Sequence, residues 1–166
     1  TGIKLWDLKV GGLDGTLAIS VQRNQNESTL QREAGTGWGD ALDQALVERD
    51  IRAAMPKWIP EGFALADIIV NDAHEVVRIN ARYKKGEDVI VFSIIQVQEG
   101  GVVDAFYEMN EESLRTETIG NLEVYFFANN ARNSAAWNED EYLVYFSGDI
   151  TEQEVEKMVQ SIFSQG

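Results

Sequence analysis

The end of the chain contains the pattern that most restricts the fold. Residues 141–147 alternate large apolar side chains on two faces, which predicts a β-strand. After a break at Gly148-Asp149, Thr151 and Glu154 have the spacing of a capping box, in which each side chain bonds the other residue's backbone N–H. Five apolar residues then follow at helical spacing: Val155, Met158, Val159, Ile162 and Phe163. A strand followed by such a one-sided helix predicts that the helix packs back onto a sheet.

More strands are predicted upstream from apolar runs, from alternation and from turn signals, over residues 64–70, 77–83, 89–97, 115–119 and 122–128. The run 89–97 is almost wholly apolar, which is typical of a strand with both faces covered. The links between strands are short, and Gly120-Asn121 is a two-residue hairpin signal. Residues 108–113 and 129–134 are predicted loops. We therefore expect the α+β class, an antiparallel sheet of about five to seven strands with the C-terminal helix on one face.

A second helix is predicted near residues 41–54. Asp40 can cap its start, and the helix must end before Pro56, whose ring restricts the preceding residue and lacks an N–H. Further upstream, residues 3–10 and 16–23 are a predicted strand pair, followed by a polar loop. We expect a single domain over residues 1–166, with a core domain at 56–166 and an N-terminal part, 1–39, that could be an appendage.

Composition excludes several classes of function. The 166 residues include 28 acidic and 14 basic side chains, giving a formal net charge of −14. The chain therefore lacks the basic footprint of a free-standing nucleic-acid binder and is disfavoured at anionic membrane surfaces. It contains no cysteine, which excludes thiol nucleophiles, thiolate zinc sites and disulfides. Its apolar runs are too short to span a bilayer, and because it begins at Thr1 we expect a processed or truncated piece.

Several motifs in the last two-thirds of the chain resemble those of a known family. They are residues 58–63 (WIPEGF), residues 120–125 (GNLEVY), Trp137 with Tyr142, and residues 148–151 (GDIT) before Glu154 and Ser161-Ile162. Over roughly residues 56–166 this pattern resembles domain of unknown function 4367. The resemblance implies the C-terminal extracytoplasmic portion of a single-pass membrane protein of Gram-positive bacteria, some of which carry an anti-sigma-factor-like segment. It implies no catalytic residues.

The titratable side chains suggest no catalytic site. His74 is the only histidine, and without a serine-containing elbow near it we interpret it as a surface residue. Acidic residues cluster at Glu108, Glu111 and Glu112, and again at Glu139, Asp140 and Glu141. Neither cluster has the spacing of a calcium loop. We interpret both as solvated loop faces, with Glu139, Asp140 and Glu141 as the candidate ligands should a weak calcium site exist.

Aromatic residues supply the candidate binding positions. Most tyrosines lie at strand periodicity and are expected in the core. Trp38, between two glycines, is the best candidate for contact with a partner, followed by Trp58 and Trp137. Three cations, Arg78, Arg82 and Lys84, are expected on the solvent-exposed face of one strand, where salt bridges across the sheet account for them.

These observations favour a non-catalytic extracytoplasmic domain that senses or binds a partner for a membrane-anchored bacterial protein, which could regulate a sigma factor. The expected partner is a protein, a peptide or a cell-envelope ligand, with no cofactor, no nucleic acid, and membrane contact only through a segment outside this chain. The alternative is a carrier of an apolar ligand or lipid between sheet and helix, which a cavity above about 300 Å³ would favour. A hydrolase would need two carboxylates converging in one cleft.

Overall fold

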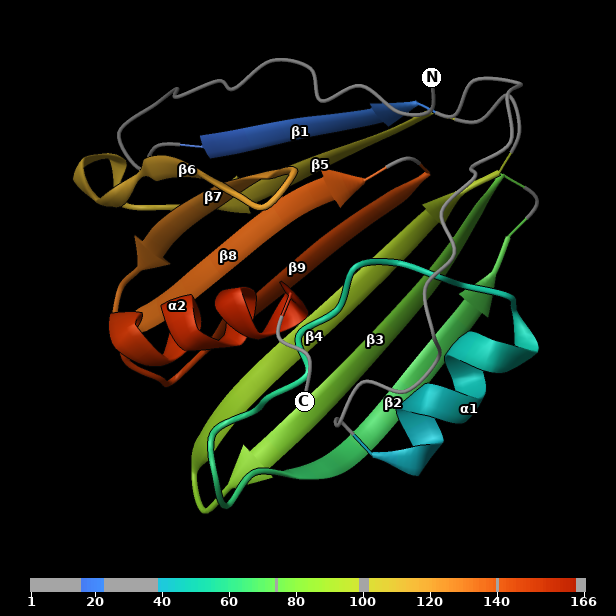
Figure 1. Ribbon diagram of the computed structural model, residues 1–166, viewed down its shortest axis with the longest axis horizontal. Helices are drawn as coiled ribbons and strands as arrows, with labels where there is room; N and C mark the ends of the chain where they lie inside the picture. The colour runs from blue at the N-terminus through green and yellow to red at the C-terminus, as the bar shows by residue number, and fades with distance from the viewer. Residues whose placement is uncertain (1–15, 23–38, 74, 99–101, 140, 164–166) are drawn as a thin grey trace.

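The structure is a computed structural model that describes residues 16–22, 39–73, 75–98, 102–139 and 141–163. Its centre is a seven-stranded antiparallel sheet in the order β2-β3-β4-β9-β8-β7-β6 (Figure 1). The strands are β2 Ala64–Asp72, β3 Val76–Lys85, β4 Asp88–Val97, β6 Arg115–Ile119, β7 Leu122–Asn129, β8 Arg132–Glu139 and β9 Tyr142–Gly148. The sheet and two helices confirm the predicted α+β class.

One face of this sheet, which we call the helix face, carries the larger of two apolar clusters. Sheet residues of this cluster include Ile79, Phe92, Trp137 and Phe146. Helix α2 (Glu152–Gln160) and the short 3-10 helix η2 (Ser161–Phe163) pack onto it, and α2 contacts β8 (Figure 1). Helix α1 (Asp40–Glu48) contacts β2 at the edge of the sheet. The predicted packing of the C-terminal helix on one face is therefore confirmed.

The capping box of α2 forms as predicted. Thr151 Oγ accepts from the N–H of Glu154 at 3.1 Å, and Glu154 Oε1 accepts from the N–H of Thr151 at 3.0 Å. The apolar stripe is buried at Val155, Met158, Val159 and Ile162. Phe163, however, is 39% exposed. Because the chain tightens into η2, this ring leaves the stripe and lies against Gly120 in the β6–β7 turn, where a Cβ would stand 2.6 Å from it.

The opposite face, which we call the ribbon face, is covered by a separate two-stranded ribbon. Strand β5 (Val102–Glu108) pairs antiparallel with β1 (Thr16–Gln22). Buried sheet residues beneath the ribbon include Ile95, Val97, Leu143 and Phe127. The C-terminal half of β4 is thus covered on both faces, as its apolar sequence predicts. In the N-terminal half of β4 the ribbon-face side chains are only half-buried.

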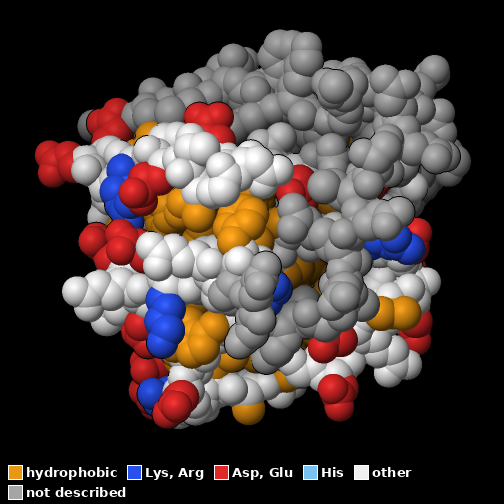
Figure 2. Space-filling view, in the orientation of Figure 1, with side chains coloured by type: hydrophobic (Ala, Val, Ile, Leu, Met, Phe, Trp, Pro, Cys, Tyr) orange, Lys and Arg blue, Asp and Glu red, His pale blue; other side chains and the backbone are white. Residues whose placement is uncertain are grey.

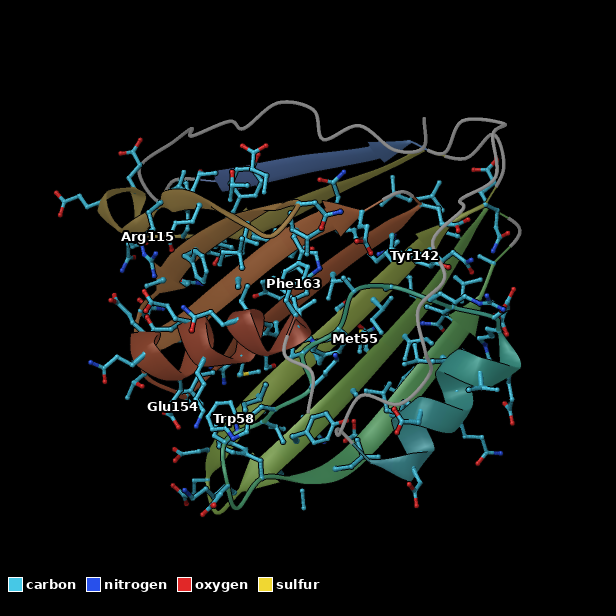
Figure 3. The ribbon with its side chains drawn as sticks, in the orientation of Figure 1. Met55, Trp58, Arg115, Tyr142, Glu154 and Phe163 are labelled. Atoms are coloured by element: carbon cyan, nitrogen blue, oxygen red, sulfur yellow. The ribbon has the colours of Figure 1, made fainter. Side chains whose placement is uncertain are left out.

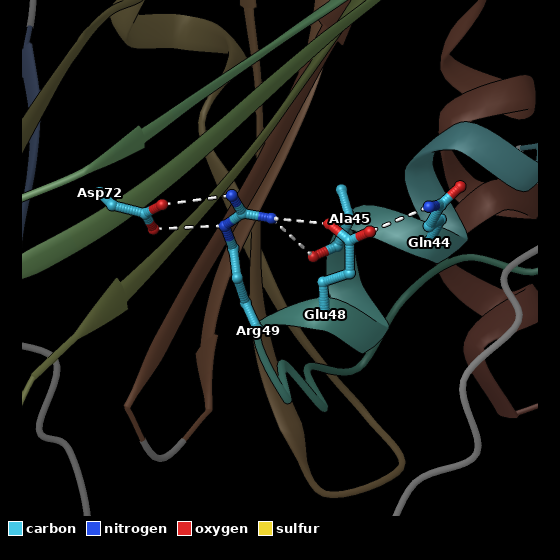
Figure 4. A network of polar contacts seen from close by, with 5 residues as sticks. All are labelled: Gln44, Ala45, Glu48, Arg49 and Asp72. Carbon is cyan, nitrogen blue, oxygen red and sulfur yellow. Dashed lines mark hydrogen bonds and ion pairs between the residues drawn. The ribbon is translucent and has the colours of Figure 1, made fainter.

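The predicted second helix exists but is shorter than residues 41–54. Gly39, with φ 107°, is the residue before α1; Asp40 is already helical and makes no capping bond. The helix ends at Glu48 because Asp50 adopts a positive φ of 50°. Beyond it, Arg49 donates from Nε and Nη2 to the two carboxylate oxygens of Asp72, each at 3.2 Å (Figure 4). This bidentate pair joins the end of α1 to β2.

Two predicted loops are also wrong in part. The segment 108–113 begins inside β5, which continues to Glu108 and ends before the 3-10 helix η1 (Glu111–Ser113). The segment 129–134 is a two-residue turn, Asn130-Ala131, followed at once by β8. Asn130 takes the positive φ of 56° that such a turn needs, and the polar residues after it are strand residues: Ser134 Oγ bonds Ser147 Oγ at 2.8 Å.

Other predictions can be placed only in part. The hairpin at Gly120-Asn121 joins β6 to β7 as predicted, and the predicted strand 16–23 appears as β1. Residues 3–10, and 24–38 of the predicted polar loop, lie outside the described residues. Within the part of the chain that the structure describes, no helix is both long and apolar enough to cross a membrane.

Gly148, at the end of β9, is expected to be intolerant of a side chain. A Cβ there would stand 2.8 Å from Cγ1 of Ile90 and 2.9 Å from the carbonyl oxygen of Val89, inside the sheet. We expect Gly148→Ala to lower the free energy of unfolding by about 2–3 kcal/mol through overpacking. Gly86→Ala is the control: it has a φ of +60° but open space around it, and should cost about 1 kcal/mol. Urea denaturation measures both, and equal losses would contradict the prediction.

Candidate functional site

An extended segment, residues 51–58, crosses the helix face between α1 and β2, and we call it the strap. Figure 3 shows two of its residues, Met55 and Trp58, on the side of the sheet that carries α2. Ala54 is fully buried, and Ile51, Ala53 and Met55 are buried with it in the main apolar cluster. The strap belongs to no strand, so its buried backbone groups need hydrogen-bond partners other than a sheet ladder.

Side chains from β8 and β9 supply those partners. Glu139 Oε1 accepts from the N–H of Ala54 at 3.0 Å, and Trp137 Nε1 donates to the carbonyl of Ala54 at 3.2 Å. The Tyr142 hydroxyl accepts from the N–H of Arg52 at 3.1 Å. The two polar groups of Ala54 are therefore bonded by two neighbouring side chains of one strand face.

The other half of the strap is fixed to the end of α2. Ser161 Oγ accepts from the N–H groups of Lys57 at 2.9 Å and Trp58 at 3.1 Å, and donates to the carbonyl of Met158 at 2.6 Å. Lys157 Nζ lies 4.0 Å from the centre of the Trp58 ring. The strap is thus bound along its length as an extended peptide would be bound by a protein surface, but the peptide is part of the same chain.

The structure brings several predicted site residues to the strap. Trp137 is fully buried and bonded to Ala54, while Trp58 is half-buried beside α2. Glu139 and Glu141 are only 7% and 6% exposed. The interpretation of this cluster as a solvated loop face is therefore wrong for both residues, because they lie at the turn between β8 and β9 where packing covers them. Trp38, His74 and Asp140 lie outside the described residues.

No metal centre emerges from the described residues, among which no three His, Cys, Asp or Glu side chains gather. The second acidic group lies at the end of β5 and in η1, where all three of its residues are exposed: Glu108, Glu111 and Glu112. The sequence signal that could have identified the strap is weak, because residues 51–55 continue the apolar spacing of α1. Only the tertiary contacts with Trp137 and Glu139 distinguish it from a helix.

Electrostatics at the strap keep Tyr142 neutral. Burial raises the pKa of its hydroxyl to about 12, and the nearby carboxylates of Glu141 and Asp50 act in the same direction. The hydrogen bond from the Arg52 N–H opposes this by favouring the ionised form. The neutral hydroxyl still accepts the bond from Arg52 at neutral pH.

A second surface lies on the part of the ribbon face that the ribbon leaves open, and we call it the basic face. Arg78, Arg82 and Lys84 are exposed in one row of β3, and Ile69 of the neighbouring β2 is 56% exposed. Arg82 Nε donates to Asp67 Oδ2 at 3.0 Å, which confirms the predicted salt bridge across the sheet for that residue. The sequence analysis missed the exposed Ile69 because it lies in an apolar run, residues 68–70, whose exposed face the local pattern does not mark.

A small hollow of about 20 Å³, open to solvent, lies where β6 and β7 meet the first turn of α2. Its lining mixes polar and apolar residues, among them Arg115, Phe126, Asn133, Glu152 and Val155. Arg115 lies over the Phe126 ring at 4.2 Å and pairs with Glu117 and Glu156. The same side of the molecule has acidic side chains around its rim, with apolar side chains visible between them (Figure 2). The hollow has the mixed, open character of a surface depression.

The chain matches one family model, described as Domain of unknown function (DUF4367), over residues 53–162. No curated protein matches the chain. The matched region contains the seven-stranded sheet, β5, α2 and all but the first two residues of the strap; α1 and β1 precede it. The family's description assigns no activity.

Removing the acceptor at Glu139 should loosen the strap. We expect Glu139→Ala to lower the free energy of unfolding by about 2–3 kcal/mol, because the buried N–H of Ala54 loses its carboxyl acceptor. Glu139→Gln keeps an oxygen there and should cost less than about 1 kcal/mol. Urea denaturation gives the stabilities, and amide hydrogen exchange at Ala54 should accelerate in the alanine variant alone. Unchanged protection of that amide in Glu139→Ala would show that the bond does not hold the strap.

The raised pKa of Tyr142 predicts a specific pH dependence. An unfolded tyrosine ionises near pH 10, whereas the pKa of Tyr142 in the fold is about 12. Between these values the unfolded chain loses a proton that the fold retains, so stability present below pH 10 declines toward pH 12. Tyr142→Phe should be less stable than the parent at pH 8, because Arg52 loses its acceptor, and the gap should narrow above pH 10. Urea denaturation from pH 8 to 12 tests this, and a constant gap would contradict it.

Proposed function

Because the chain belongs to the DUF4367 family, whose description assigns no activity, we propose its function from its geometry: a non-catalytic domain that senses or binds a partner. The polar and aromatic side chains best suited to catalysis or ligand binding instead hold the strap: Glu139, Trp137 and Tyr142. They stabilise the fold instead of facing a substrate. One surface available to another molecule is the basic face.

The place of the domain is also part of the proposal. On the resemblance to extracytoplasmic domains of Gram-positive membrane proteins, we place it outside the membrane, anchored by a transmembrane segment or a lipid that lies beyond these residues. Regulation of a sigma factor by such a protein would use the domain as the outer, ligand-responsive part. The family resemblance supports this placement.

The observation that carries the proposal is the composition of the basic face. On a chain with a net charge of −14, Arg78, Arg82 and Lys84 share one face of one strand. Side chains two residues apart on a strand stand about 7 Å apart on the same face. Arg82 is paired with Asp67, so Arg78 and Lys84 supply the positive charge beside the exposed Ile69. Such a surface complements an acidic partner with an apolar contact residue. The acidic remainder of the molecule would repel the same partner from other sides.

The packing gives no support to the alternative of an apolar-ligand carrier. Trp137, Phe146 and Met158 are fully buried and fill the layer between α2 and the sheet. The hollow described above lies at the first turn of α2, is open to solvent and, at about 20 Å³, is far smaller than the roughly 300 Å³ typical of a ligand pocket. A carrier would also need a path for the ligand past the strap.

Two single-cysteine variants test both parts of the proposal, because these 166 residues contain no cysteine. Ile69→Cys reports on the basic face, and Val47→Cys on α1 is a matched control, since the parent side chains are 56% and 58% exposed. Each is made in the full-length protein in its own bacterium, with any other cysteine replaced by serine. Labelling with a membrane-impermeant maleimide is then compared between intact cells and the purified domain.

We expect Val47→Cys to be labelled in intact cells, and Ile69→Cys to be labelled at least about fivefold more slowly relative to it than in the purified domain, because a bound partner covers the basic face. Adding Arg78→Glu should restore the labelling of Ile69→Cys by repelling an acidic partner. Labelling of Val47→Cys only after lysis would overturn the extracytoplasmic placement. The same ratio of rates in cells and in the purified domain would overturn the basic face as the partner site.

A further inference from the structure

Strand β5 is fixed to the ribbon face by its own side chains. Val103 is buried, and the ring of Tyr107 stacks on Tyr145 with their centres 4.2 Å apart. Tyr107 also lies 6.1 Å from the ring of Phe127, and Met109, just after the strand, is buried. Residues of β4, β7, β8 and β9 complete this second apolar cluster. β5 is therefore held against the seven-stranded sheet by side-chain packing, since it forms no hydrogen-bonded ladder with that sheet.

One hydrogen-bonding edge of β5 pairs with β1, which is its only ladder partner among the described strands. The register runs without a break from Thr16 opposite Glu108 to Gln22 opposite Val102. These two strands differ in origin: β5 lies inside the region that matches the family, and β1 precedes it by some thirty residues of chain. The family domain thus presents a strand edge whose partner comes from outside the domain. The backbone of such an edge can pair with an added strand, and the side chains decide which strand fits.

A second copy of this chain meets that requirement most directly. Its own residues 16–22 would form the same ladder on β5, with every pairing of the cis arrangement retained. The connection from β1 to α1, residues 23–39, could reach at most roughly 55 Å when extended, at about 3.3 Å per residue. That length exceeds the diameter of a domain of this size, about 40 Å on the usual scaling of the radius of gyration. Exchange between copies is therefore sterically accessible and costs no ladder hydrogen bonds.

We propose that the edge of β5 is a strand-accepting site, and that β1 exchanges between two copies of this chain to form a strand-swapped dimer. The ligand class is an extended peptide with the sequence of residues 16–22. This surface is distinct from the basic face and does not depend on the proposed function. Because the cis and exchanged ladders are the same, the balance between monomer and dimer is set by concentration and by residues 23–39.

A cross-chain disulfide tests the exchange, again using the absence of cysteine. One full chain carries Ile19→Cys and the other Ala105→Cys, two positions that lie opposite each other in the register. Antiparallel partners have Cα atoms about 4.5–5.5 Å apart, which permits a disulfide. The two chains are mixed at high concentration, refolded together from urea so that slow exchange does not limit the result, and mildly oxidised. Ser20→Cys replaces Ile19→Cys in the matched control, because Ser20 is opposite Asp104 and neighbouring side chains point to opposite faces.

We expect the in-register mixture to give at least about tenfold more covalent dimer than the control mixture. A synthetic peptide of residues 16–22 should suppress that dimer, and the same peptide with Ile19→Pro should not. A single chain carrying both Ile19→Cys and Ala105→Cys should close an internal disulfide when dilute. Internal closure without cross-chain dimer would overturn the exchange, and failure of internal closure would overturn the register. Equal suppression by an unrelated strand-forming peptide would overturn the assignment of a second copy as the occupant.

Discussion

A sheet with apolar side chains on both faces must be covered twice, and this constraint organises the molecule. The central strand β9 shows it directly, since Val144 and Phe146 are buried toward the helix face and Leu143 toward the ribbon face. Burying each such side chain contributes about 1.5–3 kcal/mol, whereas a backbone hydrogen bond contributes about 1 kcal/mol net. Apolar burial therefore decides that α2, the strap and β5 lie on the sheet. Hydrogen bonds decide how each of them is positioned there.

The strap shows why a few polar side chains inside this core are necessary. A helix or a strand brings its own backbone partners, but an extended single segment brings none, and each unpaired buried group would cost about 1–3 kcal/mol. Glu139, Trp137 and Ser161 remove that cost at Ala54, Lys57 and Trp58. The buried carboxylate of Glu139 is tolerable in turn because it accepts a hydrogen bond. Polar residues in the core are thus a consequence of covering part of a sheet with irregular chain.

Local pattern predicted the elements whose stability is local. The capping box at Thr151 and Glu154, the turn at Gly120 and the apolar run of β4 carry their structural reasons within a few residues. Residues 51–55 share helical spacing with α1, and nothing nearby in sequence reveals that Ala54 will be bonded by Trp137 and Glu139, more than eighty positions away. The same holds for Glu139: acids in such a run are usually solvated, and only its bond to Ala54 of the strap explains its place in the core. The candidate site was therefore less predictable than the fold.

The ribbon face joins the two surfaces proposed to meet other chains. β5 ends the covered region, and the row of cations on β3 begins beside it: Arg78 is close enough to Tyr107 to lower its pKa, against the larger raising effect of burial. A molecule docked on the basic face would consequently border the same tyrosine that anchors β5. An acidic partner that pairs with Arg78 would change the electrostatic environment of Tyr107. A displacement of β5 would in turn change the surface next to the basic face. Any coupling of this kind must be reciprocal, so partner binding would alter strand exchange by the same factor as exchange alters partner binding.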